Sequence, residues 1–274
     1  MLSARSAQQP LSRTRAADLL LAPARNARPT LRPPALRRPR AVSESFSTEA
    51  SPSVSHAIQT RRSVRAFLPD PVAESDVREI LEIASRSASG GNLQPWKVSV
   101  LAGAARDALV GAVAERMLAT PFGEGPEYDI YPHDLTEPYH GRRGQVAKDM
   151  YALVGIERDD AAGRVRQMGR NFSFFDAPVG MFISIDRNMG PPQFSDLGIF
   201  LQSIMLLARE RGLHTCPQEA WSLWGKSIRE FTDIPEDELI FCGVSLGYAV
   251  PDAAINDLYT GRAPVDEFAT FKGF

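Results

Sequence analysis

Three arginines and a serine lie within five residues at Arg61-Arg62-Ser63-Val64-Arg65. A guanidinium group donates paired hydrogen bonds to phosphate oxygens, so this segment has the chemistry to hold a phosphate monoester. A solvated basic turn would have the same composition, and the segment alone does not separate the two interpretations. It is therefore a candidate anion site that needs support from other parts of the chain.

A second segment of special residues is Ser89-Gly90-Gly91-Asn92-Leu93-Gln94-Pro95-Trp96. Its glycines allow close backbone approach, and its two side-chain amides can hydrogen-bond a flat polar ring. Two further turns follow: Cys216-Pro217-Gln218-Glu219-Ala220-Trp221 offers backbone N–H groups, and Tyr259-Thr260-Gly261-Arg262-Ala263-Pro264 adds another arginine. The second segment strengthens the first, because an ordinary turn needs fewer special residues.

Other kinds of site lack their motifs. The four histidines are scattered, and Cys216 and Cys242 have no metal-ligand spacing, which disfavours a metal enzyme. Neither the dinucleotide-binding fingerprint nor the P-loop occurs, and no G-x-S-x-G motif supports a hydrolase. We therefore predict no metal site and name no side chain as catalytic.

The elements that must position these segments are helices interspersed with few strands. Apolar spacing and capping predict helices at residues 54–60, with Ser53 as N-cap, 76–87, 104–119, 145–168, 197–211 and 222–231. Apolar runs predict strands at 96–101, 179–185 and 239–250. Because strands and helices do not alternate strictly, we expect an α+β fold.

Residues 120–140 contain four prolines and predict a long irregular loop. Loops of this length are commonly lids or binding loops. Its aromatic side chains either line a substrate pocket or pack within a lid; they are Tyr128, Tyr131, His133, Tyr139 and His140. Tyr131 and His133 are our candidate substrate contacts.

Charge is distributed unevenly along the 274-residue chain, whose net charge is −2. Residues 1–50 hold nine arginines against three acidic residues, whereas the remainder has a net charge of −8. The first segment is a disordered extension, an organellar transit peptide with a short helix at 11–24, or a nucleic-acid tether.

We divide the chain into an Arg/Ala/Pro-rich segment, 1–50, and one domain, 51–274. We expect a cytoplasmic location, or a mitochondrial one if residues 1–50 are a transit peptide.

No apolar run reaches the length of a membrane-spanning helix, and we expect neither a membrane nor a nucleic-acid partner. The C-terminal segment 251–274 nevertheless carries much apolar surface: Leu258, Tyr259, Val265, Phe268, Phe271 and Phe274. This surface is buried either within its own subunit or against a second copy of the chain.

The order and spacing of the four segments resemble the flavin-dependent nitroreductase family. The resemblance covers about four fifths of the chain, from His56 to the C-terminus, and its most specific motifs are R-R-S-V-R followed by S-G-G-N-L-Q-P-W. It implies a nitroreductase-like α+β fold with a central, mostly antiparallel sheet flanked by helices. It also implies an intertwined homodimer whose C-terminal tails are exchanged between subunits and whose FMN sites lie at the interface.

The matching positions imply an FMN site. Arg61, Arg62, Ser63 and Arg65 would hold the phosphate and ribityl chain, with Arg262 completing the phosphate site. Ser89, Asn92 and Gln94 would contact the ring or the ribityl chain, and Pro217, Gln218, Glu219 and Ala220 would place backbone amides at the ring edge. Ala88 and Thr260 depart from the family pattern, in which proline and lysine are common, so we expect weaker phosphate affinity.

The resemblance implies a ping-pong cycle in which NAD(P)H reduces the flavin and a nitroaromatic or quinone-like acceptor is then reduced. The same fold could serve a flavin reductase, a dehalogenase or a ligand dehydrogenase. A non-catalytic flavin-binding protein tethered by the basic segment is the alternative from another class. The preference between NADH and NADPH stays open.

Overall fold

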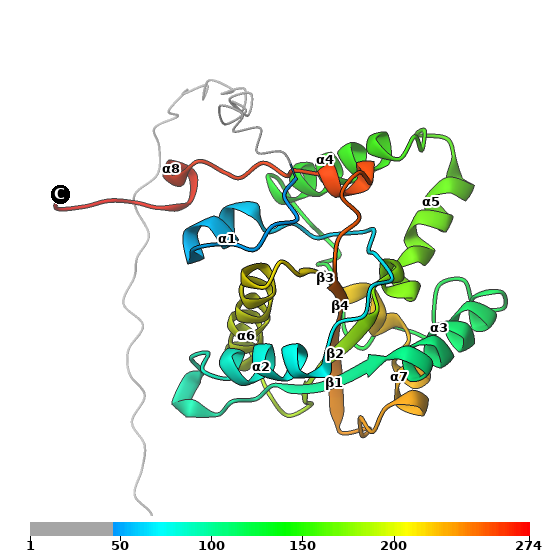
Figure 1. Cartoon of the computed structure of the whole chain (residues 1–274). Helices are drawn as coiled ribbons and strands as arrows, with labels where there is room; N and C mark the ends of the chain where they lie inside the picture. Colours follow the sequence, from blue (N-terminus) through cyan, green and yellow to red (C-terminus); the bar gives the residue numbers. More distant parts are fainter. Residues whose placement is uncertain (1–45) are drawn as a thin grey trace, which may run out of the picture. The chain divides into compact units, whose positions relative to one another are not determined.

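Four strands form one sheet in the computed structural model, which describes residues 46–274 (Figure 1). The strands are β1 (Lys97–Ala102), β2 (Val179–Asp186), β3 (His214–Gln218) and β4 (Glu238–Gly247). Their order across the sheet is β1-β2-β4-β3, and every neighbouring pair is antiparallel. The predicted α+β fold with a mostly antiparallel sheet is confirmed.

Helices cover both faces of the sheet, because β2 is buried from Val179 to Ile185 and its side chains need apolar partners on each side. On one face, α2 (Glu74–Ala84) and α6 (Pro191–Glu210) contribute to the apolar cluster around β2 and β4. On the other face, α3 (Gly103–Met117), α7 (Gly225–Phe231) and the 3-10 turns η2 (Arg170–Asp176) and η3 (Glu219–Leu223) form a second cluster rich in aromatic rings.

Two strand glycines let aromatic rings of this second cluster touch the sheet. A Cβ atom at Gly180 would lie 2.4 Å from the Phe174 ring, and one at Gly243 would lie 2.2 Å from the Trp221 ring. Both rings are completely buried. A side chain at either glycine would therefore displace the aromatic core from the strands.

The remaining elements are α1 (Val54–Thr60), α4 (Tyr139–Leu153), α5 (Ala161–Gly169) and α8 (Val265–Phe268), with 3-10 turns η1 (Gly90–Asn92) and η4 (Ala254–Asp257). Helix α1 has the predicted bounds, and the Ser53 hydroxyl accepts the His56 N–H as an N-cap. Helix α6 begins six residues earlier than predicted, with Pro191 in the first turn, and is followed by Gly212 at φ +72°.

Three sequence predictions are wrong in detail. Residues 145–168 form two helices, because Gly155 adopts φ +65° after α4 and Asp160 caps α5 by accepting the Gly163 N–H. The expected turn from Cys216 begins only at Glu219, because Cys216–Gln218 belong to β3 and pair with β4. Strand β3 was not predicted, because a five-residue strand that contains a proline has little sequence signal. Residues 222–223 complete η3, so the last predicted helix starts at Gly225.

The first described residues contact the domain. Arg209, buried near the end of α6, donates hydrogen bonds to the carbonyls of Ser47 (3.4 Å) and Glu49 (2.7 Å). The Phe46 ring lies 5.2 Å from the His214 ring. The boundary predicted after Ala50 therefore falls inside a packed segment, while the helix predicted at 11–24 lies outside the described residues.

No helix within residues 46–274 is long and apolar enough to cross a membrane. In the same part of the chain, no group of three or more His, Cys, Asp or Glu side chains could hold a metal ion.

Candidate functional site

The arginine-rich segment 61–65 runs beside β3. Ser63 forms a parallel bridge with Thr215, and the Val64 N–H donates to the Thr215 carbonyl over 3.1 Å. Successive side chains of an extended segment point to opposite sides. Arg61, Ser63 and Arg65 therefore share one side of the segment, and Arg62 shares the other with the fully buried Val64.

We call Arg61, Arg65 and Arg262 the arginine cluster, because Arg61 lies near Arg262 and both Arg61 and Arg65 lie near Cys216. Burial lowers the pKa of Arg61, and the nearby Arg262 charge lowers it further. Burial raises the pKa of the Cys216 thiol in β3, and the Arg65 and Arg61 charges partly oppose that effect. Among residues 46–274, no carboxylate forms an ion pair with any member of the cluster. Such a donor set fits a multiply charged anion such as a phosphate.

Thr260 orients the last arginine of the cluster. Arg262 Nη1 donates to the Thr260 hydroxyl over 2.7 Å, and it lies 3.0 Å from the carbonyls of Thr260 and Gly261. Thr260, at the position where a lysine is expected, thus supports the Arg262 guanidinium.

Arg62 lies outside the arginine cluster. Its guanidinium carbon is 5.4 Å from the Phe46 ring centroid and 5.2 Å from the Tyr259 ring centroid. Its Nη1 donates to the Asn256 carbonyl over 3.2 Å. The side chain therefore joins the beginning and the end of the domain, and this position does not support the phosphate contact expected for it.

The turn after β3 is anchored by the buried side chain of Gln218. Its Nε2 donates to the Asn171 carbonyl over 2.7 Å, and its Oε1 accepts the Ser245 hydroxyl over 2.6 Å. Pro217 precedes it in β3, and Glu219 and Ala220 open η3. Glu219 is exposed as a residue, but partial desolvation of its carboxyl group raises the pKa of that group.

The glycine-containing loop 89–94 has a constrained backbone. Gly91, Asn92 and Gln94 adopt left-handed conformations with φ of 59°, 58° and 50°. This conformation is strained for Gln94, whereas asparagine adopts it more readily. The Ser89 hydroxyl opposes the strain by accepting the Gln94 N–H over 3.0 Å. The side chains of Asn92 and Gln94 are exposed.

This loop and the arginine cluster contact α6 at different positions along the helix. The Asp196 carboxylate accepts the Gly90 N–H at 3.2 and 3.3 Å. The Arg61 Nη1 lies 4.0 Å from the sulfur of Met205. Nine residues of helix correspond to a rise of about 14 Å. The structure therefore brings segments 61–65 and 216–220 and Arg262 together, and holds loop 89–94 apart from them.

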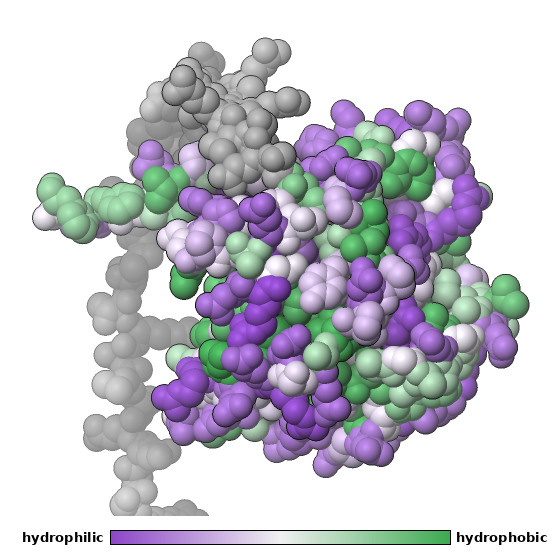
Figure 2. Space-filling view, viewed as in Figure 1, coloured by the Kyte–Doolittle hydropathy of each residue, from purple (hydrophilic) through white to green (hydrophobic). Residues whose placement is uncertain are grey.

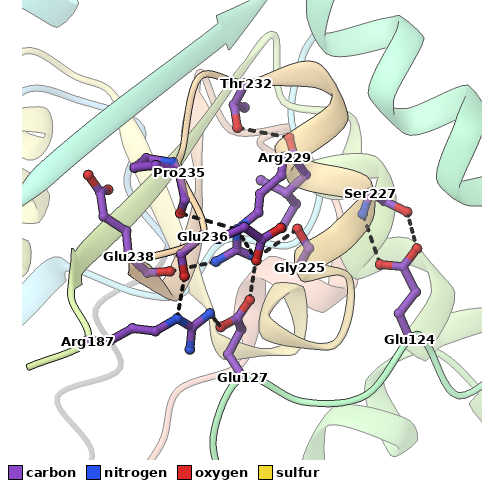
Figure 3. A network of polar contacts seen from close by, with 11 residues as sticks. Glu124, Glu127, Arg187, Gly225, Ser227, Arg229, Thr232, Pro235, Glu236 and Glu238 are labelled. Carbon is purple, nitrogen blue, oxygen red and sulfur yellow. Dashed lines mark hydrogen bonds and ion pairs between the residues drawn. The ribbon is translucent and has the colours of Figure 1, made fainter.

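Ion pairs fix the first half of the proline-rich loop to α7 and to the end of β2. Glu127 pairs with both Arg187 and Arg229, and Glu124 accepts the Ser227 N–H and hydroxyl at 2.9 and 2.7 Å (Figure 3). The Glu127 side chain is only 8% exposed. Residues 124–127 are thus held in place, which does not support a lid in this part of the loop.

Tyr128 is the loop aromatic that lies near the turn after β3. Its hydroxyl donates to the Phe241 carbonyl over 2.6 Å. Burial raises the pKa of Tyr128, and the Glu219 charge raises it further. Tyr128 therefore has a stronger structural link to the candidate site than the two loop residues chosen from the sequence.

Tyr131 and His133 lie further out on the same loop. The Arg143 guanidinium is 4.0 Å from the Tyr131 ring centroid, and His133 Nε2 is 3.4 Å from a carboxylate oxygen of Asp129. Tyr131 is 48% exposed, and the His133 side chain is 85% exposed. Their role as substrate contacts stays a prediction.

Two residues that hold the predicted segments were missed from the sequence, Asp196 and Asn256. Asp196 had a weak signal, since it is an acid directly before the apolar run Leu197–Leu207. Asn256 had none, because Arg65, whose N–H it accepts over 2.9 Å, lies 191 positions earlier in the chain.

Comparison with known proteins finds relatives over most of the chain. The Nitroreductase family model matches residues 58–248. The chain is 40% identical over 221 residues to the chloronitrobenzene nitroreductase of Comamonas testosteroni, covering 81% of this chain and 97% of that protein. The crystal structure of the FMN and NADPH-dependent nitroreductase NfnB from Sphigopyxis sp. strain HMH matches with a TM-score of 0.78 and 44% identity, over 81% of this chain and 100% of that one. The FMN-dependent nitroreductase NfnB from Mycobacterium smegmatis, in complex with NADPH, matches with a TM-score of 0.76 and 30% identity, over 80% and 97% of the two chains.

Proposed function

The chain belongs to the nitroreductase family, and we propose that it is an FMN-dependent enzyme that reduces nitroaromatic or quinone-like acceptors with NAD(P)H. The relatives described above supply the class of reaction. The observation in this chain that carries the proposal is the arginine cluster, which no carboxylate within residues 46–274 neutralises. The phosphate of FMN carries the charge that such a cluster attracts.

Each group of residues has its own role toward the cofactor. Arg61, Arg65 and Arg262 bind the phosphate, and the Ser63 hydroxyl lies on the same side of its segment. Residues 217–220, at the end of β3 and the start of η3, present backbone groups to the ring edge, where hydrogen-bond donors stabilise negative charge on the reduced ring. When bound, FMN supplies the hydride chemistry, so no side chain needs to act as a nucleophile.

An absorbance spectrum of the purified full-length protein tests this function. We expect flavin bands that bleach under anaerobic NADH or NADPH and return when a nitrobenzoate is added. A colourless protein that cannot be reconstituted with FMN would contradict the cofactor. Flavin that is reoxidised by a quinone but not by a nitroaromatic compound would keep the cofactor and exclude the nitroaromatic acceptor.

The proposal includes a homodimer in which each FMN contacts both subunits. Loop 89–94 is exposed and lies about 14 Å along α6 from Arg61, so its Ser89, Asn92 and Gln94 serve the site of the partner. Ile199 on α6 is also 46% exposed, an apolar side chain next to the buried Phe200. Both features are what a site shared between two subunits requires.

The C-terminal tail supports the exchange of segments between subunits. Val265, Phe268, Phe271 and Phe274 are exposed, and Figure 2 shows a hydrophobic tail projecting at the left of the molecule. Within its own chain the tail is buried only as far as Leu258. Beyond it, Tyr259 lies against Arg62 and Glu267 pairs with Arg142, but the four apolar side chains stay exposed. Exposed phenylalanines at this density call for a covering partner.

Replacing Phe268, Phe271 and Phe274 with serine should weaken the dimer. Burial of each phenylalanine contributes about 1.5–3 kcal/mol, so the dimer dissociation constant should rise at least about a thousandfold. Light scattering at micromolar concentration measures the change. Phe122→Ser is the control, because Phe122 is 87% exposed but lies in the proline-rich loop. A monomeric wild-type protein would contradict the dimer.

A further inference from the structure

Asn256, in η4, is a buried polar residue between the two parts of the chain that carry the arginine cluster. Arg61 and Arg65 come from the start of the domain, whereas Arg262 follows Asn256 by six residues. We infer that Asn256 is a positioning residue for the FMN phosphate, because it ties the segment of Arg65 to the segment of Arg262. This inference rests on the cofactor site proposed above.

Every hydrogen-bonding group of the Asn256 side chain is used in this connection. Its Oδ1 accepts the Arg65 N–H over 2.9 Å, and its Nδ2 donates to the carbonyls of Ala66 (2.9 Å) and Val250 (3.1 Å). Its own carbonyl accepts a hydrogen bond from Arg62 Nη1. With 1% of its surface exposed, Asn256 acts as an internal bridge rather than as a ligand of the cofactor.

The arginine cluster needs such a bridge because its charges repel one another. The Arg262 charge contributes to the lowered pKa of Arg61, so the two guanidinium groups interact unfavourably while no anion lies between them. Leu258 is buried, but Tyr259 and Arg262 beyond it are exposed. Without Asn256, movement of this exposed segment would relieve the repulsion and separate the two arginines.

Separation of the arginines has a specific cost for the phosphate. A site that is already assembled binds its ligand without a further ordering cost, whereas a relaxed one must be reassembled on binding. The binding free energy that is lost is the contribution of the flavin phosphate. Riboflavin has the same ring and ribityl chain but lacks the phosphate, so the charge-assisted hydrogen bonds between phosphate and arginine cluster are absent from its binding.

The test compares the dissociation constants of FMN and riboflavin for the flavin-free, full-length protein. In Asn256→Ala we expect the FMN constant to rise on the order of tenfold or more, with the riboflavin constant within about twofold of wild type. Ser184→Ala is the matched control, since the buried Ser184 hydroxyl donates to Glu238 in the sheet. It should lose stability to urea without changing the ratio of the two constants.

Asn256→Ser, which keeps one hydrogen-bonding group, carries the same test if the alanine variant does not fold. An unchanged ratio in a folded Asn256 variant overturns the inference and leaves the proposed function intact. A parallel rise of both constants also overturns it, because a general structural role would weaken both flavins. A wild-type protein that binds neither flavin overturns the proposed function itself, and this inference with it.

Discussion

Replacing Arg61 and Arg262 together with alanine should give a protein that purifies largely without flavin. Each charge-assisted hydrogen bond to a phosphate contributes about 1.5–3 kcal/mol, so the double variant should bind FMN on the order of a thousandfold more weakly. The two arginines repel each other in the flavin-free protein, as the lowered pKa of Arg61 indicates. The flavin-free variant should therefore be at least as stable to urea as the flavin-free wild-type protein. Flavin content by absorbance and FMN titration measure the effect.

Arg78→Ala combined with Arg158→Ala is the matched control for this experiment. Both side chains are exposed, and the pair removes the same net charge. The control should retain FMN, and the Arg61 and Arg262 variant should bind riboflavin as wild type does. A double variant that remains fully yellow would exclude the arginine cluster from the cofactor site.

Acid should destabilise the protein below about pH 6.5, and His214 should account for a distinct part of the loss. Burial, together with the Arg209 and Arg62 charges, lowers the pKa of His214 to about 3. The ring nitrogen Nε2 lies 3.0 Å from Arg209 Nη1, so the folded state needs a neutral ring that accepts a hydrogen bond. The unfolded chain binds a proton near pH 6.5, and the folded chain does so only near pH 3. The free energy of unfolding therefore falls by about 1.4 kcal/mol per pH unit in this window.

Urea unfolding between pH 7.5 and pH 5, at one protein concentration, measures this slope. At pH 5 the His214 contribution amounts to about 2 kcal/mol. His214→Gln keeps an acceptor for Arg209 but cannot gain a proton, so it should remove this part of the slope. His133→Gln should keep it, because the His133 side chain is 85% exposed. A His214→Gln variant with the wild-type slope would refute the assignment.

Local patterns predicted most of the secondary structure. Ser53 and the apolar spacing of α1 and α2 act within a few residues, so those helices appear where the sequence places them, within two or three residues at the ends. The chain breaks between α4 and α5 because of Gly155 and the Asp160 cap. The charged face along residues 145–168 had predicted one continuous helix instead. Strand β3 exists because β4 offers it a partner, and a partner distant in the chain leaves no local pattern.

For the candidate site too, the residue types could be predicted from the sequence, but their arrangement in space could not. The arginines, the glycine-containing loop and the turn before Trp221 were visible as residue types with a shared chemistry. Which arginine joins the cluster was not visible, because Arg61 and Arg62 are adjacent and chemically identical. Pairing of segment 61–65 with β3 decides it, since that pairing turns neighbouring side chains to opposite sides.

By itself, therefore, the sequence determined the fold class, the family resemblance and the four segments that could bind a phosphorylated flavin, since these depend on residue types and short spacings. Only the tertiary structure decided that Arg62 stacks between Phe46 and Tyr259, and that Asn256 bridges segments 191 positions apart. It also decided that loop 89–94 lies along α6 from the arginine cluster. Such contacts form between elements that are remote in the chain, and their energies depend on packing geometry that no short stretch of residues contains.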